Sequence, residues 1–321
     1  MLRVGWVLVL ICAALPCAAQ TLADELRAAQ VPQAGFTQAE LAQTINGIHA
    51  VHGTFTWVTY VRIGKDNAIT GFPQVIRYDS STGSLQRREM PAGDAENCCG
   101  SPEGIKFTQS FVIASFDDTP SAETALVLDS QLRLTSILYG FNLQEVAPDQ
   151  VVFIENMIQF AAQHPERLRF VDLKTGATSE LYPLKDDHLR DAFSRLNAQH
   201  MPSPQECQVG NDPCDPNLFD EDIEFLSSGA GSFQIRVGRQ SDHPGEASGQ
   251  TSFQAAAYTY QLKDGRWFYC EQELAPPAMV RIHGQRVPEL EPAACSPSIP
   301  ALADPNAGMQ SPFPDIIRKV N

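Results

Sequence analysis

The sequence predicts an all-β fold built from antiparallel meanders, because short apolar runs alternate with turn residues through most of the chain. Residues 151–154 form an apolar, β-branched run, and residues 168–171 resume this strand character after a break. The segment 172–176 is a turn whose last residue, Gly176, can adopt positive φ, and residues 178–182 return as a partner strand. This succession of strand, turn and strand is typical of a β-meander.

The same kind of turn recurs along the chain, which indicates a repeat. It ends at Gly83, Gly176 and Gly265, and these glycines lie about 90 residues apart, so each interval has room for two units of the ~40–50 residues typical of a propeller blade. Hairpin patterns at residues 125–134 and 223–237 supply one further unit within each interval. The chain therefore resembles β-propeller repeat proteins, which implies a β-propeller-like fold with about four to five antiparallel blades.

The resemblance covers residues 54–274 and concerns the fold alone. No segment carries the Trp-Asp or kelch signature, so no functional residue follows from it. The alternative architecture is a pair of β-sandwich domains divided near residue 200. With 321 residues, of which 43% are hydrophobic, the chain can form a substantial core in either case.

Residues 1–19 have the features of a secretory signal peptide. Arg3 precedes an apolar stretch, and small residues allow cleavage after Ala19. The apolar stretch is too short to span a bilayer, so we expect a secreted or periplasmic protein with no membrane insertion after cleavage. Lipidation at Cys17 is the weaker alternative, because Pro16 stands where a small residue is expected.

The net charge of −15 at pH 7 restricts the partners. An acidic surface repels phosphates and anionic headgroups, so binding to nucleic acid or to a membrane surface is disfavoured. The acidity also keeps an exported protein soluble. We expect a monomer that binds an unknown protein or glycan ligand and uses no cofactor.

Residues 20–53 are predicted to form an N-terminal helical segment. Thr37 and Glu40 fit a capping box at the start of one helix. His49 and His52 lie three residues apart and could share a metal ion on a helix, but ordinary surface or packing roles are the preferred interpretation.

Strands are expected to follow in order. Residues 54–63 alternate, with one apolar face and one mostly polar face. The segments 73–78 and 84–88 complete the first blade, and residues 107–116 form the next long strand.

A helical and acidic insertion is predicted at residues 186–224. Asp186 or Asp187 can cap a helix with an apolar face, which ends before Pro202. The acidic part offers oxygen ligands that suit calcium, and the weak metal candidates are Asp212, Asp215, Asp220 and Asp222. A solvated acidic segment is the preferred interpretation, because the spacing is not that of an EF-hand.

The segment 275–321 is rich in proline and is expected to be an extended C-terminal tail. A small hairpin can form within it, with its turn at His283 and Gly284.

Three polar residues within or beside a strand-connecting loop are weak catalytic candidates if the chain is an enzyme: Glu155, His164 and Arg167. A role in shaping the turn is preferred, and the sequence has no nucleophile elbow, phosphate-binding glycine loop or zinc motif. We therefore predict an exported, disulfide-stapled binding or scaffolding protein. The alternative is an extracellular hydrolase or lyase with an axial site of histidine and carboxylates.

Six cysteines remain after removal of the signal peptide, and export would expose them to an oxidising compartment. Proximity along the chain favours pairing Cys207 with Cys214 and Cys270 with Cys295. The remaining Cys98 and Cys99 are adjacent in the sequence. They could form a strained vicinal bridge with each other, one or both could pair with a distant cysteine, or they could stay reduced.

Overall fold

A computed structural model describes residues 20–90, 100–119, 122–155, 166–200, 208–209, 212–213, 219–242, 251–274, 279–282, 285–288, 295–304 and 317–319. Strands account for 61% and helices for 11% of the structure. The three main sheets are antiparallel, with five, eight and five strands, and none of them is closed. The predicted all-β class is confirmed, whereas a closed propeller is not shown.

The N-terminal sheet carries two short helices on one face. Its strands, in spatial order, are β1 (Gln20–Thr21), β2 (Thr44–His52), β3 (Phe55–Ile63), β4 (Ile69–Asp79) and β5 (Ser84–Glu89). The helices are α1 (Leu22–Ala28) and α2 (Gln38–Leu41). The predicted capping box is present in α2, where the Thr37 side chain accepts from the Glu40 backbone and the Glu40 side chain accepts from the Thr37 backbone.

The prediction of a helical segment over residues 20–53 is wrong after α2. Gly53, with φ 60°, closes a tight turn that allows β2 to pair with β3 along its length. Because side chains alternate along a strand, His49 and His52 point to opposite faces and cannot share a metal ion. His49 Nδ1 lies 2.7 Å from a carboxylate oxygen of Glu25 in α1, and His52 stacks on Phe107.

The central sheet is the largest. Its strands are β6 (Ser101–Phe107), β7 (Val112–Thr119), β8 (Ala122–Leu128), β9 (Leu134–Ala147), β10 (Gln150–Glu155), β11 (Leu168–Asp172), β12 (Thr178–Tyr182) and β22 (Ile317–Lys319), the last of which pairs with β9. The single strand predicted at residues 107–116 is instead the hairpin of β6 and β7, because a turn at Thr108–Phe111 reverses the chain.

Strand β9 changes partner at its middle, and Gly140 makes this possible. Its residues 134–139 pair with β8, whereas residues 140–147 pair with β10. A Cβ atom at Gly140 would lie 2.3 Å from the Ile154 carbonyl oxygen and 2.4 Å from the Phe153 ring. Only glycine therefore allows the two backbones to approach as they do.

The C-terminal sheet contains β15 (Asp220–Gly229), β16 (Ser232–Asp242), β17 (Thr251–Lys263), β18 (Arg266–Glu273) and β21 (Ile299–Pro300). Helix α3 (His188–His200) packs against β17 and β18. Two small hairpins pair β13 (Gln208–Val209) with β14 (Asp212–Pro213) and β19 (Met279–Ile282) with β20 (Gln285–Pro288). The second hairpin lies where the sequence predicted it.

Strand pairing groups the main sheets into four meanders of four strands. The first meander is β2–β5, the second is β6–β8 with the first half of β9, the third is the second half of β9 with β10–β12, and the fourth is β15–β18. The recurrent glycine turns at Gly83, Gly176 and Gly265 join the third and fourth strands of the first, third and fourth meanders. In the second meander the positive-φ position of this turn is taken by Leu132, with φ 61°.

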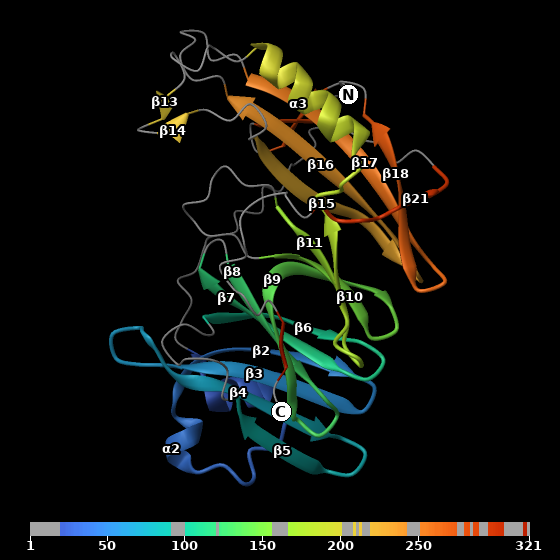
Figure 1. Cartoon of the computed structure of the whole chain (residues 1–321). Coiled ribbons are helices and arrows are strands. Elements are labelled where there is room, and N and C mark those ends of the chain that lie inside the picture. The colour runs from blue at the N-terminus through green and yellow to red at the C-terminus, as the bar shows by residue number, and fades with distance from the viewer. Residues whose placement is uncertain are drawn as a thin grey trace, which may run out of the picture.

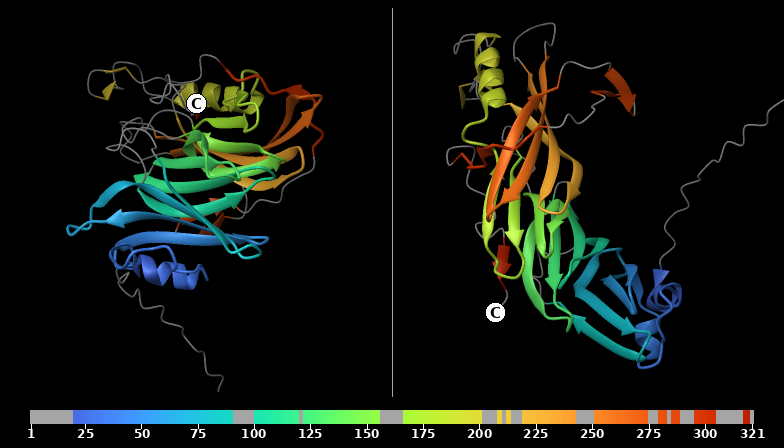
Figure 2. Two further views of the ribbon diagram at one scale, coloured as in Figure 1. Left: turned by 90° about the horizontal axis from the view of Figure 1, so that it is seen from below. Right: turned by 90° about the vertical axis from the view of Figure 1, so that its right-hand side faces the viewer.

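The meanders stack face to face in a curved array, from the blue N-terminal sheet to the orange C-terminal sheet (Figures 1 and 2). One apolar cluster joins the first and second meanders, a second joins the second and third, and a third joins the third and fourth. On β10, Val152 and Ile154 belong to the last of these clusters while Val151 and Phe153 belong to the middle one. Its uninterrupted apolar run therefore follows from burial of both faces.

Helices complete the two ends of the stack. Leu22 and Leu26 of α1 pack against the outer face of the first meander, where Val58 and Tyr60 of β3 are buried. The expectation of a mostly polar second face on this strand is wrong, since the helices cover it. At the other end, the helix predicted after Asp187 is present as α3, and Phe193 faces the protein while Leu196 is 48% exposed. None of the described helices is long and apolar enough to cross a bilayer.

Candidate functional site

A groove crosses the stack where the first hairpin turns of all four meanders come together. It consists of two adjoining hollows of about 720 and 430 Å³, which share His52, Phe107, Thr108 and Glu145. His52 comes from the first meander, Phe107 and Thr108 from the second, and Glu145 from the third, while Gly229 of the fourth meander lines the larger hollow. Strand β2 lies beside β6, and β9 lies beside β15, so first strands of the meanders are neighbours around this groove.

An aromatic pair forms one wall of the groove. The imidazole of His52 stacks on the ring of Phe107 with a centroid distance of 4.7 Å and an interplanar angle of 18°. Trp57 supports Phe107 from behind in an edge-on arrangement at 6.4 Å. His52 itself is exposed, so its ring is supported by the core and accessible from the groove.

A buried carboxylate fixes the wall between the second and third meanders. Asp149, in the turn between β9 and β10, accepts hydrogen bonds from Thr108 Oγ1 at 2.6 Å, Ser110 N at 2.6 Å and Ser110 Oγ at 2.7 Å, and pairs with Lys174 at 2.7 Å. Burial would raise the pKa of Asp149, but these donors outweigh it and lower the pKa to about 2. The carboxylate is therefore ionised at neutral pH and holds two turns together.

A backbone hydrogen bond fixes the wall between the third and fourth meanders. Gly231 N donates to the Val146 carbonyl at 2.6 Å, which ties the β15–β16 turn to β9. Together with the contacts of Asp149, this bond sets the positions of the turns before any ligand is bound.

Among the described residues, Lys106 and Glu145 are the charged side chains that line the two hollows, and both make hydrogen bonds with the walls. The ammonium of Lys106 donates to the Leu143 carbonyl, and burial lowers the pKa of Lys106 against the opposing effect of Glu123. Glu145 Oε1 accepts from Asp149 N at 3.2 Å. The groove therefore holds its fixed charges in contacts with its own walls.

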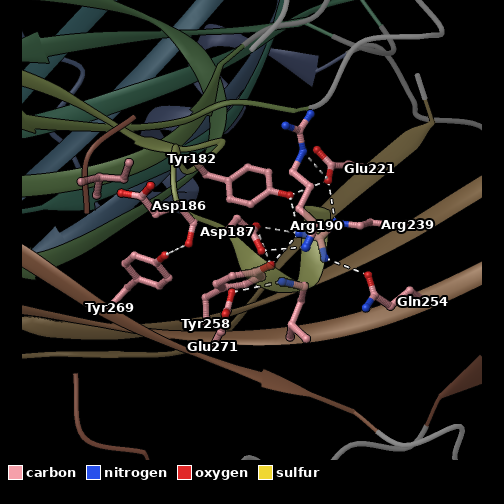
Figure 3. A network of polar contacts seen from close by, with 12 residues as sticks. Tyr182, Asp186, Asp187, Arg190, Glu221, Arg239, Gln254, Tyr258, Tyr269 and Glu271 are labelled. Atoms are coloured by element: carbon pink, nitrogen blue, oxygen red, sulfur yellow. Dashed lines mark hydrogen bonds and ion pairs between the residues drawn. The ribbon is translucent and has the colours of Figure 1, made fainter. Parts of the chain in front are cut away.

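A network of buried charges lies between the third and fourth meanders (Figure 3). Arg239 on β16 is its centre, and its Nε donates to Glu221 at 2.7 Å while Nη2 donates to Asp187 at 2.8 Å. The hydroxyls of Tyr182 and Tyr258 donate to the same two carboxylates at 2.6 and 2.7 Å. Burial by itself would lower the pKa of Arg239, but the surrounding tyrosines and carboxylates hold it well above its ordinary value.

The position of this network indicates a structural role. It connects the end of β12 through Tyr182, the cap of α3 through Asp187, and the fourth meander through Glu221 and Arg239. All of these side chains are buried, so a ligand in solution does not reach them. Glu221 Oε2 has no hydrogen-bond partner within the described structure. The burial of Glu221 is therefore compensated through Oε1, which pairs with Arg239 at 2.7 Å and with Arg190 at 3.3 Å.

Two further carboxyl groups near this network have unusual acidities. Glu166 accepts a hydrogen bond from Ile223 N at 2.5 Å, and burial, aided by the charges of Asp222 and Glu221, raises its pKa to about 7. Burial and the neighbouring Asp187 raise the pKa of Glu271 to about 7 as well. Both groups therefore change charge near neutral pH.

Of the three catalytic candidates predicted from the sequence, the two that lie within the described residues do not line the groove. Glu155 is buried and pairs with Arg169 at 2.8 Å, and its backbone N–H donates to the Arg167 carbonyl at 2.9 Å. Neither Glu155 nor Arg167 lines either hollow, and His164 lies outside the described residues. The prediction of catalysis by these residues stays untested.

The predicted acidic insertion ends in strand β15. Its alternation exposes Asp220 and Asp222 on one face and buries Glu221 on the other, so the expectation of a wholly solvated segment is wrong for Glu221. Asp212 lies in β14, and Asp215 falls outside the described residues. Within the described ranges no group of three histidine, cysteine or acidic side chains is placed to hold a metal ion.

One of the predicted disulfides is present. Cys270 on β18 is bonded to Cys295, with the Cα atoms 6.2 Å apart, and the bridge joins the fourth meander to the tail that carries β21. The other four cysteines, Cys98, Cys99, Cys207 and Cys214, lie outside the described residues, so their pairing stays a prediction.

Sequence comparison adds no relative to this description: no model of a known protein family matches the chain, and no curated protein matches it. Among the groove residues, the sequence singled out His52 alone as a possible ligand, for a metal ion shared with His49, and an ordinary surface or packing role was the preferred interpretation. The turns between the first and second strands of each meander were the signal that could have found the groove. In the second meander that turn was hidden, because residues 107–116 read as one continuous strand.

Proposed function

We propose that this protein is an exported binding protein that holds its ligand in the groove between the first turns of its four meanders. The convergence of these turns is the observation that carries the proposal. The two hollows measure a few hundred Å³ and combine apolar walls with several polar side chains, and concave sites of this size commonly bind ligands.

Contacts within the protein fix the walls of the groove before a ligand binds. Asp149 ties the turns of the second and third meanders, and the bond from Gly231 to Val146 ties the third and fourth. A rigid site loses little conformational entropy on binding, so even a few contacts can give useful affinity.

The four meanders are best described as an open, propeller-like array. Each has four antiparallel strands, successive meanders pack face to face, and neighbouring first strands lie closest to the groove. Propeller blades are arranged in this way around a central channel. Small-angle scattering that fits a pair of separate sandwich domains, divided near residue 200, would contradict this description.

Export is supported by two independent features. The signal-peptide pattern of residues 1–19 directs secretion, and the Cys270–Cys295 bridge requires an oxidising compartment to persist. We therefore place the mature protein in the periplasm or outside the cell. Fractionation of expressing cells tests this placement, and recovery of the unprocessed chain in the cytoplasm would refute it.

The binding proposal is tested by filling the groove. Ala230 is exposed and lines the larger hollow, so Ala230→Trp should occlude it without disturbing the core. Ala39 is an exposed residue of α2 at the far end of the stack, and Ala39→Trp is the matched control. In a saturation-transfer NMR screen of small polar fragments, we expect binders that Ala230→Trp abolishes and Ala39→Trp retains. Binders that respond equally to both variants, or no binders at all, would refute the groove as the site.

A further inference from the structure

The charged side chains of the groove make hydrogen bonds with its own walls. The Lys106 ammonium is bound by the Leu143 carbonyl, and one oxygen of Glu145 is bound by the Asp149 backbone. The net charge of −15 further opposes anionic ligands. An anionic ligand is therefore disfavoured at the groove.

Uncharged hydrogen-bonding groups remain available there. Gln109 lines the larger hollow and Gln144 the smaller one, and their side-chain amides make no hydrogen bond with other described residues. Each amide has both donors and an acceptor, so it can bind a hydroxyl group in either direction. The second oxygen of Glu145 adds an acceptor between them.

The aromatic wall complements these groups. His52 lines both hollows, and Phe107 supports its ring from one side. A ring held in this way offers a flat, polarisable surface to the C–H face of a sugar, whose hydroxyl groups then point sideways toward the amides.

Within the described residues, the groove offers few free backbone groups to the main chain of a peptide. In the turns that line the groove, Ser110 N is already bound by Asp149, and Gly231 N is already bound by the Val146 carbonyl. An added strand needs free backbone groups, and these two are occupied.

On the basis of the function proposed above, we infer that the ligand is a neutral oligosaccharide chain. One sugar ring stacks on His52, and the hydroxyl groups of this ring and its neighbours bind Gln109, Gln144 and Glu145. Two hollows that adjoin along the groove accommodate more than one sugar unit.

Isothermal titration calorimetry on the full mature protein tests this inference. The probes are four neutral hexasaccharides (cellohexaose, maltohexaose, xylohexaose and N-acetylchitohexaose), the acidic hexagalacturonate, and a library of random decapeptides. We expect at least one neutral hexasaccharide to bind. His52→Ala should weaken that binding by about tenfold, the effect of losing one good aromatic contact. Gln109→Ala, which removes an exposed side chain, should weaken it by about threefold.

His49→Ala is the matched control, because His49 lies on the same strand but faces α1. This variant should bind like the wild type. Binding of hexagalacturonate or decapeptides alone, if sensitive to His52→Ala, would overturn the neutral sugar while leaving the groove as a binding site. Neutral-sugar binding that His52→Ala does not change would overturn the assignment of the sugar to this groove. Binding of no probe would overturn the inference as well, and the fragment screen with Ala230→Trp then decides separately whether the groove binds at all.

Discussion

Replacing Glu166 by glutamine should stabilise the protein at pH 8 and leave its stability at pH 4.5 nearly unchanged. The carboxyl group is partly buried at the junction of the third and fourth meanders, where it accepts a hydrogen bond from Ile223 N. Burial first, and then the charges of Asp222 and Glu221, raise its pKa from 4.5 to about 7. The folded protein therefore binds this proton more tightly than the unfolded chain does.

The sign and size of the effect follow from this difference. Between about pH 4.5 and pH 7 the folded state carries a proton that the unfolded state has lost, so the free energy of unfolding decreases as the pH rises. Each pKa unit corresponds to about 1.4 kcal/mol, so ionisation of the partly exposed Glu166 costs at most about 3.5 kcal/mol above pH 7, and solvent screening reduces this figure. Glutamine keeps an oxygen that can accept from Ile223 N but never ionises.

Urea unfolding followed by tryptophan fluorescence, at intervals from pH 4.5 to 8, measures the effect. The Glu166→Gln variant should exceed the wild type by a margin that grows with pH. Glu273→Gln, which changes an exposed carboxylate on β18, is the control and should follow the wild type. Glu123 and Glu271 also have pKa values raised to about 7, so a residual slope should persist in both variants. If the difference between Glu166→Gln and the wild type does not vary with pH, or if the variant is less stable at pH 8, the reasoning is wrong.

Three further predictions concern stability and are measured by the same unfolding assay at pH 7 unless stated. Asp149→Ala should cost about 2–4 kcal/mol, because the donors from Thr108, Ser110 and Lys174 lose their acceptor. The pKa of Asp149 in the folded state is lowered to about 2, so the ionised carboxylate contributes fully to wild-type stability above about pH 4. This contribution should disappear as the pH falls toward 2, and the Asp149→Ala variant should not show that loss. Arg239→Met should cost about 3–5 kcal/mol, because Asp187 then stays buried without its cation and Glu221 keeps only the more distant Arg190, and an effect below 1 kcal/mol would contradict this account of the network. Cys295→Ser should cost about 3.5 kcal/mol by the chain-entropy estimate for a bridge spanning a sequence separation of 25, and equal stability of oxidised and reduced wild-type protein would argue against it.

Local patterns in the sequence were sufficient to predict much of the fold. The glycine turns mark the third hairpin of three meanders because a positive φ there disfavours other residues, and the Thr37–Glu40 box begins α2 for equally local reasons. The apolar run at residues 151–154 predicted a strand, and it is uninterrupted because both faces of β10 are covered. Each of these features depends on residues close together in the chain.

The candidate site could not be predicted in this way, because it depends on which faces meet when the meanders stack. His52, Phe107, Glu145 and Gly229 come from four meanders, and no pattern within any one of them shows that their turns converge. Glu221 is similar, since an acidic stretch is normally solvated and the placement of Arg239 and Arg190 beside it compensates its burial. The sequence thus determined many of the strands, the three glycine turns and the Cys270–Cys295 bridge through local backbone preferences and proximity, but neither strand β2 nor the turn between β6 and β7. The tertiary structure alone decided the groove and the buried charges, because both are produced by packing between segments that are distant in the chain.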